Sequence, residues 1–183
     1  MARAALLVAA LACGLAAAAD AGAQSLRASE IFSAAVRERG GEPLGRIDDL
    51  LLDTHGSRVD YAILVTPEGK RFPAPLTAFR PHGERLELDL ERAALGGAAG
   101  FAAAGGAPSG YVALRGLLGR EVKRAGGGHA GALRDVVIDF ETGEVRYAIV
   151  DYDPPSAEAP LGVPLGRLEL PAGDGPVILG EDP

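Results

Sequence analysis

The chain has 183 residues, with 18 Lys and Arg against 25 Asp and Glu, so its formal net charge is -7. An acidic chain repels nucleic acid and anionic lipid, which excludes both as expected partners. Its single cysteine, Cys13, excludes a disulfide framework and any metal site built from several cysteines.

The first 23 residues have the pattern of an export signal. Arg3 gives a positive start, an apolar run covers 4–19, and Ala21-Gly22-Ala23 supplies the small residues that a signal peptidase needs. The apolar run is shorter than the roughly 20 residues of a membrane span. We therefore expect cleavage after Ala23, a periplasmic or secreted protein, and no membrane span after cleavage. Retention as an anchor and lipidation at Cys13 are the alternatives.

One phrase of the sequence occurs twice. Residues 45–65, GRIDDLLLDTHGSRVDYAILV, return 86 residues later at 131–151 as GALRDVVIDFETGEVRYAIVD. Beyond the phrase the offset drifts to 89 and then to about 91, as insertions in turns would cause. Two copies are too few for a solenoid, which needs about three. The chain therefore divides into a leader (1–23), a first unit (26–90), a linker (91–110) and a second unit (111–183).

The linker is dominated by two residue types. Of its 20 residues, 14 are Ala or Gly, which is typical of a flexible connection. A unit of this size buries only about 60% of its chain surface and is marginally stable alone. We therefore expect the two units to pair with each other, or the chain to form a homodimer.

Inside each unit the hydrophobic pattern is that of strands. Val59, Tyr61, Ile63 and Val65 alternate with their neighbours, and turn signals recur every 10 to 15 residues without helical patterns between them. Residues 50–52 and their counterparts 136–138 are apolar on both faces, which indicates a curled sheet with something packed outside it. We expect an all-β protein with two small antiparallel β-barrels in tandem, joined by the Ala/Gly-rich linker.

The order of these features resembles the PRC-barrel family. The first copy carries a glycine pair, the block Gly45 to Asp53, the run Val59 to Val65 and a Pro-Leu at 75–76; the second repeats the order from Gly131 to a Pro-Leu at 164–165. The resemblance implies a small β-barrel that serves as a binding or adaptor module, without catalysis of its own. It names no partner and no cofactor.

Two positions carry an aspartate in both copies. Asp53 and Asp139 end a strand and open a turn, where a carboxylate accepts backbone N–H groups. Asp49 and Asp135 lie in mid-strand, where an unpaired buried carboxylate would cost several kcal/mol. The expected partners are arginines of the same copy, Arg46 or Arg58 for the first and Arg134 or Arg146 for the second. A partner-facing acid, or a cation site that includes Asp48, is the alternative.

Patterns that would support catalysis are weak. Residues 126–131 match GxGxxG, but a β-branched run follows them where dinucleotide binding requires a helix. His55, His82 and His129 fall in unrelated turns, with no spacing suited to a metal site. None of the serines after the leader lies in a GxSxG elbow. We therefore expect no enzyme, no cofactor and no metal.

The copies differ most after the repeated phrase, where the second has the longer and more acidic segment 151–160. Binding residues favour such loops. The candidate partner-binding residues are Phe140, Asp151, Tyr152 and Asp153. The function expected from the sequence is a non-catalytic binding or adaptor (scaffold) module of a bacterial envelope with a protein partner. A periplasmic small-ligand or cation-binding protein, acting in stress sensing, is the alternative.

Overall fold

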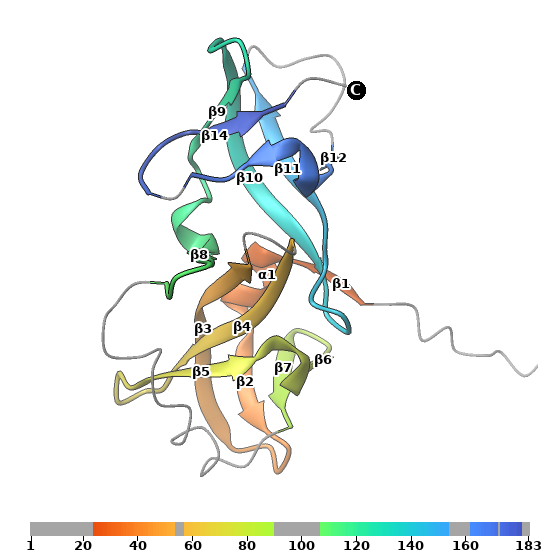
Figure 1. Ribbon diagram of the computed structural model, residues 1–183. Coiled ribbons are helices and arrows are strands. Elements are labelled where there is room, and N and C mark those ends of the chain that lie inside the picture. Colours follow the sequence, from red (N-terminus) through yellow and green to blue (C-terminus); the bar gives the residue numbers. More distant parts are fainter. Residues whose placement is uncertain (1–23, 54–56, 90–106, 154–161, 172, 181–183) are drawn as a thin grey trace, which may run out of the picture.

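The computed structural model describes residues 24–53, 57–89, 107–153, 162–171 and 173–180. These residues are mostly in strands, as the alternating pattern predicts, and the strands form two sheets of seven. Figure 1 shows one sheet above the other, with the short helix α1 and strand β8 between them.

The first sheet has the strand order β5-β4-β3-β2-β7-β6, with β8 added on β3. Its central strand is the 11-residue β3, and β2 lies parallel to β7. The elements of the first unit are β1 (Ser25–Arg27), α1 (Ala28–Ser33), β2 (Ala35–Glu38), β3 (Pro43–Asp53), β4 (Arg58–Val65), β5 (Arg71–Pro75), η1 (Leu76–Ala78), β6 (Phe79–His82) and β7 (Arg85–Leu88).

The second sheet repeats that order as β12-β11-β10-β9-β14-β13, with β1 added on β10. Val122 of β9 pairs with Val177 of β14, as Val36 pairs with Leu86 in the first sheet, so the offsets of 86 and 91 residues join structurally equivalent positions. The elements are β8 (Tyr111–Ala113), η2 (Leu114–Gly116), β9 (Glu121–Arg124), β10 (His129–Asp139), β11 (Val145–Tyr152), β12 (Gly162–Val163), η3 (Leu165–Arg167), β13 (Leu168–Glu169) and β14 (Val177–Leu179).

The sheets differ in two respects from the antiparallel barrels expected. Each sheet is mixed, because β7 and β14 return parallel to β2 and β9. In the part of the chain that the structure describes, neither sheet closes into a barrel. The outer strand β5 carries Pro73 and Pro75, which have no N–H to donate to a further strand.

The two units exchange their first strands. β1, at the start of the first unit, pairs with β10 of the second, and β8, at the start of the second unit, pairs with β3 of the first. Leu26 lies opposite Ile138, and the equivalent Val112 lies opposite Leu52. β1 and β8 therefore cover the ends of the long strands, and residues 50–52 and 136–138 are apolar on both faces because they face this contact.

The hydrophobic core is continuous through both units. A single cluster of buried side chains includes Ile31 and Leu52 of the first unit with Leu114 and Ile138 of the second. Because this cluster is shared, the stability of each unit depends on apolar contacts with the other.

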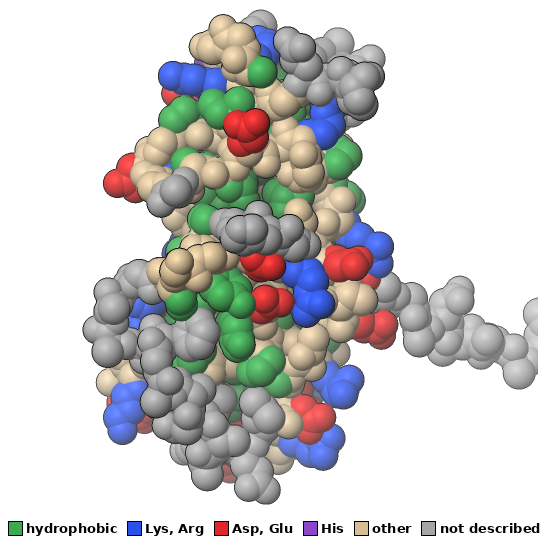
Figure 2. Space-filling model, in the orientation of Figure 1, with side chains coloured by type: hydrophobic (Ala, Val, Ile, Leu, Met, Phe, Trp, Pro, Cys, Tyr) green, Lys and Arg blue, Asp and Glu red, His purple; other side chains and the backbone are tan. Residues whose placement is uncertain are grey.

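Figure 2 shows that acidic and basic side chains are interspersed on one face of the molecule, with no extended patch of one sign.

Gly45 and Gly131 occupy equivalent positions at which β3 and β10 cross a neighbouring strand closely. Their φ angles are 142° and 151°, a region that residues with a side chain rarely adopt. A Cβ at Gly45 would overlap the carbonyl oxygen of Val65, and one at Gly131 would overlap that of Asp151. The two glycines are thus required by backbone geometry.

We expect Gly45→Ala and Gly131→Ala each to lower the free energy of unfolding by about 2 kcal/mol or more, because each forces an unfavourable φ and displaces a strand. Urea unfolding monitored by circular dichroism measures the loss. Gly40→Ala is the control, since no atom lies within 4 Å of its Cβ position. Equal free energies of unfolding for all three variants would contradict the conclusion that backbone geometry requires glycine at positions 45 and 131.

Candidate functional site

The mid-strand aspartates bind the opposite unit. The Asp49 carboxylate accepts the backbone N–H of Arg115 at 2.9 Å and that of Leu50 at 2.8 Å. The Asp135 carboxylate accepts the N–H of Ser29 at 3.2 Å, the Ser29 hydroxyl at 2.5 Å and the N–H of Val136 at 2.8 Å. Ser29 and Arg115 are themselves 86 residues apart, so each aspartate binds the same segment of the other copy.

The arginine partners expected for these two aspartates are wrong. A register shift precedes each aspartate, between Ile47 and Asp49 and between Leu133 and Asp135, and it turns both carboxylates toward the other unit. The four arginines bind other acids instead: Arg46 binds Asp48, Arg58 binds Asp60, Arg134 binds Asp151 and Arg146 binds Asp139.

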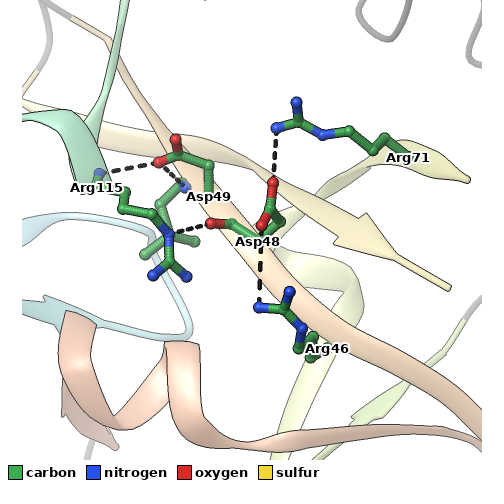
Figure 3. A network of polar contacts seen from close by, with 6 residues as sticks. Arg46, Asp48, Asp49, Arg71 and Arg115 are labelled. Atoms are coloured by element: carbon green, nitrogen blue, oxygen red, sulfur yellow. Dashed lines mark hydrogen bonds and ion pairs between the residues drawn. The ribbon is translucent and has the colours of Figure 1, made fainter. Parts of the chain in front are cut away.

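Arg115 connects the two units around Asp49 (Figure 3). Besides its N–H contact with Asp49, it donates from Nε to the carbonyl oxygen of Asp48. Its guanidinium carbon lies 4.0 Å from the centroid of the Phe32 ring in α1, a cation–π contact. One side chain thus touches both β3 and α1 of the opposite unit.

Asp48 points away from Asp49 and is neutralised by arginines. Its carboxylate lies 2.8 Å from Arg71 and 3.9 Å from Arg46 (Figure 3). The carboxylates of a cation site converge on the ion, whereas those of Asp48 and Asp49 point in different directions. Among the described residues, no group of three or more His, Cys, Asp and Glu could hold a metal ion.

The electrostatic environments of Asp49 and Asp139 differ. Burial raises the pKa of Asp49, against the hydrogen bonds from Arg115 and Leu50 that lower it. Asp139 is only 1% exposed, and burial alone would raise its pKa as well. Hydrogen bonds from the Arg146 guanidinium and the N–H groups of Thr142 and Glu141 outweigh burial and hold the pKa of Asp139 below its usual value.

The expected turn role is confirmed for Asp139. Its carboxylate accepts the N–H of Glu141 at 2.9 Å and that of Thr142 at 3.1 Å, which closes the turn between β10 and β11. Asp53 ends β3 in the same way, but residues 54–56 of its turn lie outside the described residues.

The candidate partner-binding residues have different surroundings. Phe140 is 2% exposed and belongs to the core cluster, and its N–H donates to the carbonyl oxygen of Gln24. Its ring is therefore not available at the surface for a partner. Asp151 binds Arg134 at 2.8 Å, Tyr152 packs half-buried against the core, and Asp153 is exposed. Most of the acidic segment 151–160, namely 154–160, lies outside the described residues.

A groove of about 630 Å³ opens in the first unit. The hydroxyl oxygen of Thr66 is buried and has no hydrogen-bond partner among the described residues. The groove runs between the end of α1, the start of β2 and the turn after β4, and is lined by Phe32, Ser33, Ala34, Ala35, Gly45, Arg46, Val65, Thr66, Pro67 and Gly69.

Two residues that line the groove, Thr66 and Ala34, have larger counterparts in the second unit. Thr66 corresponds to Tyr152, which packs against the core, and Ala34 corresponds to Arg120. Arg120 donates to the carbonyl oxygens of Gly116 at 2.5 Å and Gly175 at 3.1 Å and so ties down the loop before β14. Aligning the repeats at these positions is the sequence signal that would have located the groove.

No protein-family model matches the chain, and no curated protein matches it. In the described part of the chain, no helix is long and apolar enough to cross a membrane.

The pH dependence of stability should report on Asp139. Because its pKa is lower in the folded chain than the ordinary value of about 3.9, its stabilisation is complete above that value and is lost as pH falls through the folded pKa. We expect Asp139→Asn to cost about 2 kcal/mol at pH 7 and much less at pH 2, as measured by urea unfolding. Asp174→Asn, whose carboxylate is fully exposed, is the control and should change stability little at either pH. If Asp139→Asn lowered the free energy of unfolding by the same amount at pH 7 and at pH 2, the lowered pKa of Asp139 would be contradicted.

Proposed function

We propose that the protein is an exported, non-catalytic binding or adaptor module of the bacterial envelope, built from two units of the PRC-barrel type. The leader pattern of residues 1–23 supports export. The order of motifs in each copy, and the strand order common to both sheets, support the family. On this proposal each mixed sheet is an open variant of the small barrel.

The groove of the first unit carries the proposal. The small residues Thr66 and Ala34 line the groove, whereas the second unit has at these positions Tyr152, which packs against its core, and Arg120, which binds the loop before β14. The walls of the groove are apolar at Phe32, Val65 and Pro67.

The second unit also indicates what the groove would accept. A partner segment that presents an aromatic side chain would occupy the place that the Tyr152 ring takes in the other copy. An acidic group on that segment could reach Arg46, which lines the groove and whose side chain is 60% exposed. The proposed partner is therefore a protein segment with an aromatic anchor.

Filling the groove tests this function. We expect Thr66→Tyr to reduce capture of the physiological partner at least tenfold, because the new ring occupies the partner's place. Crosslinking in the native envelope, with quantitative mass spectrometry of the captured proteins, measures the loss.

Glu84→Tyr is the matched control, since it adds the same ring at an exposed turn that does not line the groove. Proteins captured by the parent chain and by this control, but lost with Thr66→Tyr, are groove partners. Identical captured sets for all three chains would contradict the proposal.

A small ligand is the second candidate, because the groove volume falls within the range of about 300 to 1,000 Å³ typical of ligand pockets. A ligand at 100 times its Kd should stabilise the parent by about 2.7 kcal/mol. Thermal unfolding of the parent and Thr66→Tyr with small aromatic acids separates the candidates: stabilisation of the parent alone would favour the ligand.

A further inference from the structure

The contacts between the two units are reciprocal. Val59 donates its N–H to the carbonyl oxygen of Gly143 at 2.8 Å, and Val145 donates to Ser57 at 3.1 Å. With the offset of 86 residues, Val145 is the counterpart of Val59, and Gly143 is that of Ser57. Exchanging the two units therefore converts one of these hydrogen bonds into the other.

The same reciprocity holds at the other contacts. β1 on β10 has its counterpart in β8 on β3, with identical register. The bond from the N–H of Ser29 to Asp135 has its counterpart in the bond from Arg115 to Asp49. A contact in which each surface meets its own counterpart is the defining property of a two-fold dimer interface.

One contact marks the axis itself. Arg58 and Glu144 form an isolated antiparallel bridge, and these two residues are each other's counterparts, 86 positions apart. At a two-fold axis a residue must meet its own equivalent, as this pair does. The β10–β11 turn reaches the first unit at this point (Figure 1).

We propose that the chain is a dimer of two units fused by a linker, and that the interface is complete without the linker, so that a second copy of this chain can supply either unit. Each of these contacts joins residues outside 91–110. The linker then acts by raising the local concentration of one unit around the other, to roughly millimolar for a short flexible connection.

The experiment uses the full chain with a specific protease site inserted in 91–106, folded first and then cut. We expect the two fragments to remain a 1:1 complex in size-exclusion chromatography and native mass spectrometry. Two cut preparations, one of them labelled with ¹⁵N, should exchange units on incubation and give complexes of mixed mass.

A variant at the axis gives the interface its own readout. A Cβ at Gly143 would lie 2.5 Å from the carbonyl oxygen of Val59, so Gly143→Ala should raise the Kd of the cut fragments at least tenfold. Gly127→Ala is the matched control: its φ of 86° is close to the 77° of Gly143, it belongs to the same unit, and no atom lies within 4 Å of its Cβ position.

Separation of the parent fragments after cutting would overturn the proposal, and so would equal weakening by the two alanine variants. Retained 1:1 complexes that never exchange units would overturn the part that concerns a second copy. Because none of these measurements involves the groove, their outcome is independent of the proposed partner.

Discussion

The exchange of first strands between the units is the interaction on which the rest of the structure depends. Backbone N–H and C=O groups at the ends of β3 and β10, beyond their pairing with β2 and β9, would otherwise be open to pairing with another chain. β8 and β1 pair with these ends, and the short helical segments that follow them bring Arg115 and Ser29 to Asp49 and Asp135. The covered edges, the satisfied carboxylates and the shared core all follow from this one arrangement.

The contacts that occur in both units stabilise the molecule, and the proposed function rests on a position where the units differ. Asp49 and Asp135 are used identically, as acceptors for N–H groups of the opposite unit, which offsets the cost of burying a carboxylate. The groove is lined by Thr66, at a position where the second unit has Tyr152, which packs against its core. The proposed binding role rests on this difference between the copies.

Much of the fold could be predicted because its signals are local. Strand periodicity and turn residues act over a few positions, and the shifting offset of the repeat correctly matched strands as distant as β7 and β14. The partner of Asp49 could not be predicted in that way. It is the N–H of a residue 66 positions away, on the other unit, and a bulge decides which way the carboxylate turns. Phe140, predicted as a partner contact, belongs to the core, and its N–H bonds Gln24, a residue remote in sequence.

By itself, the sequence determined that the chain is β-rich and duplicated, that glycine stands at the two close crossings, and that Asp139 closes a turn. These features depend on backbone conformation and on the alternation of neighbouring residues. Only the tertiary structure decided that the sheets are mixed and, in the described part of the chain, not closed, that the units exchange strands, and that a groove opens in the first unit. Those outcomes depend on which distant surfaces meet, and residues far apart along the chain carry no local signal of their contact.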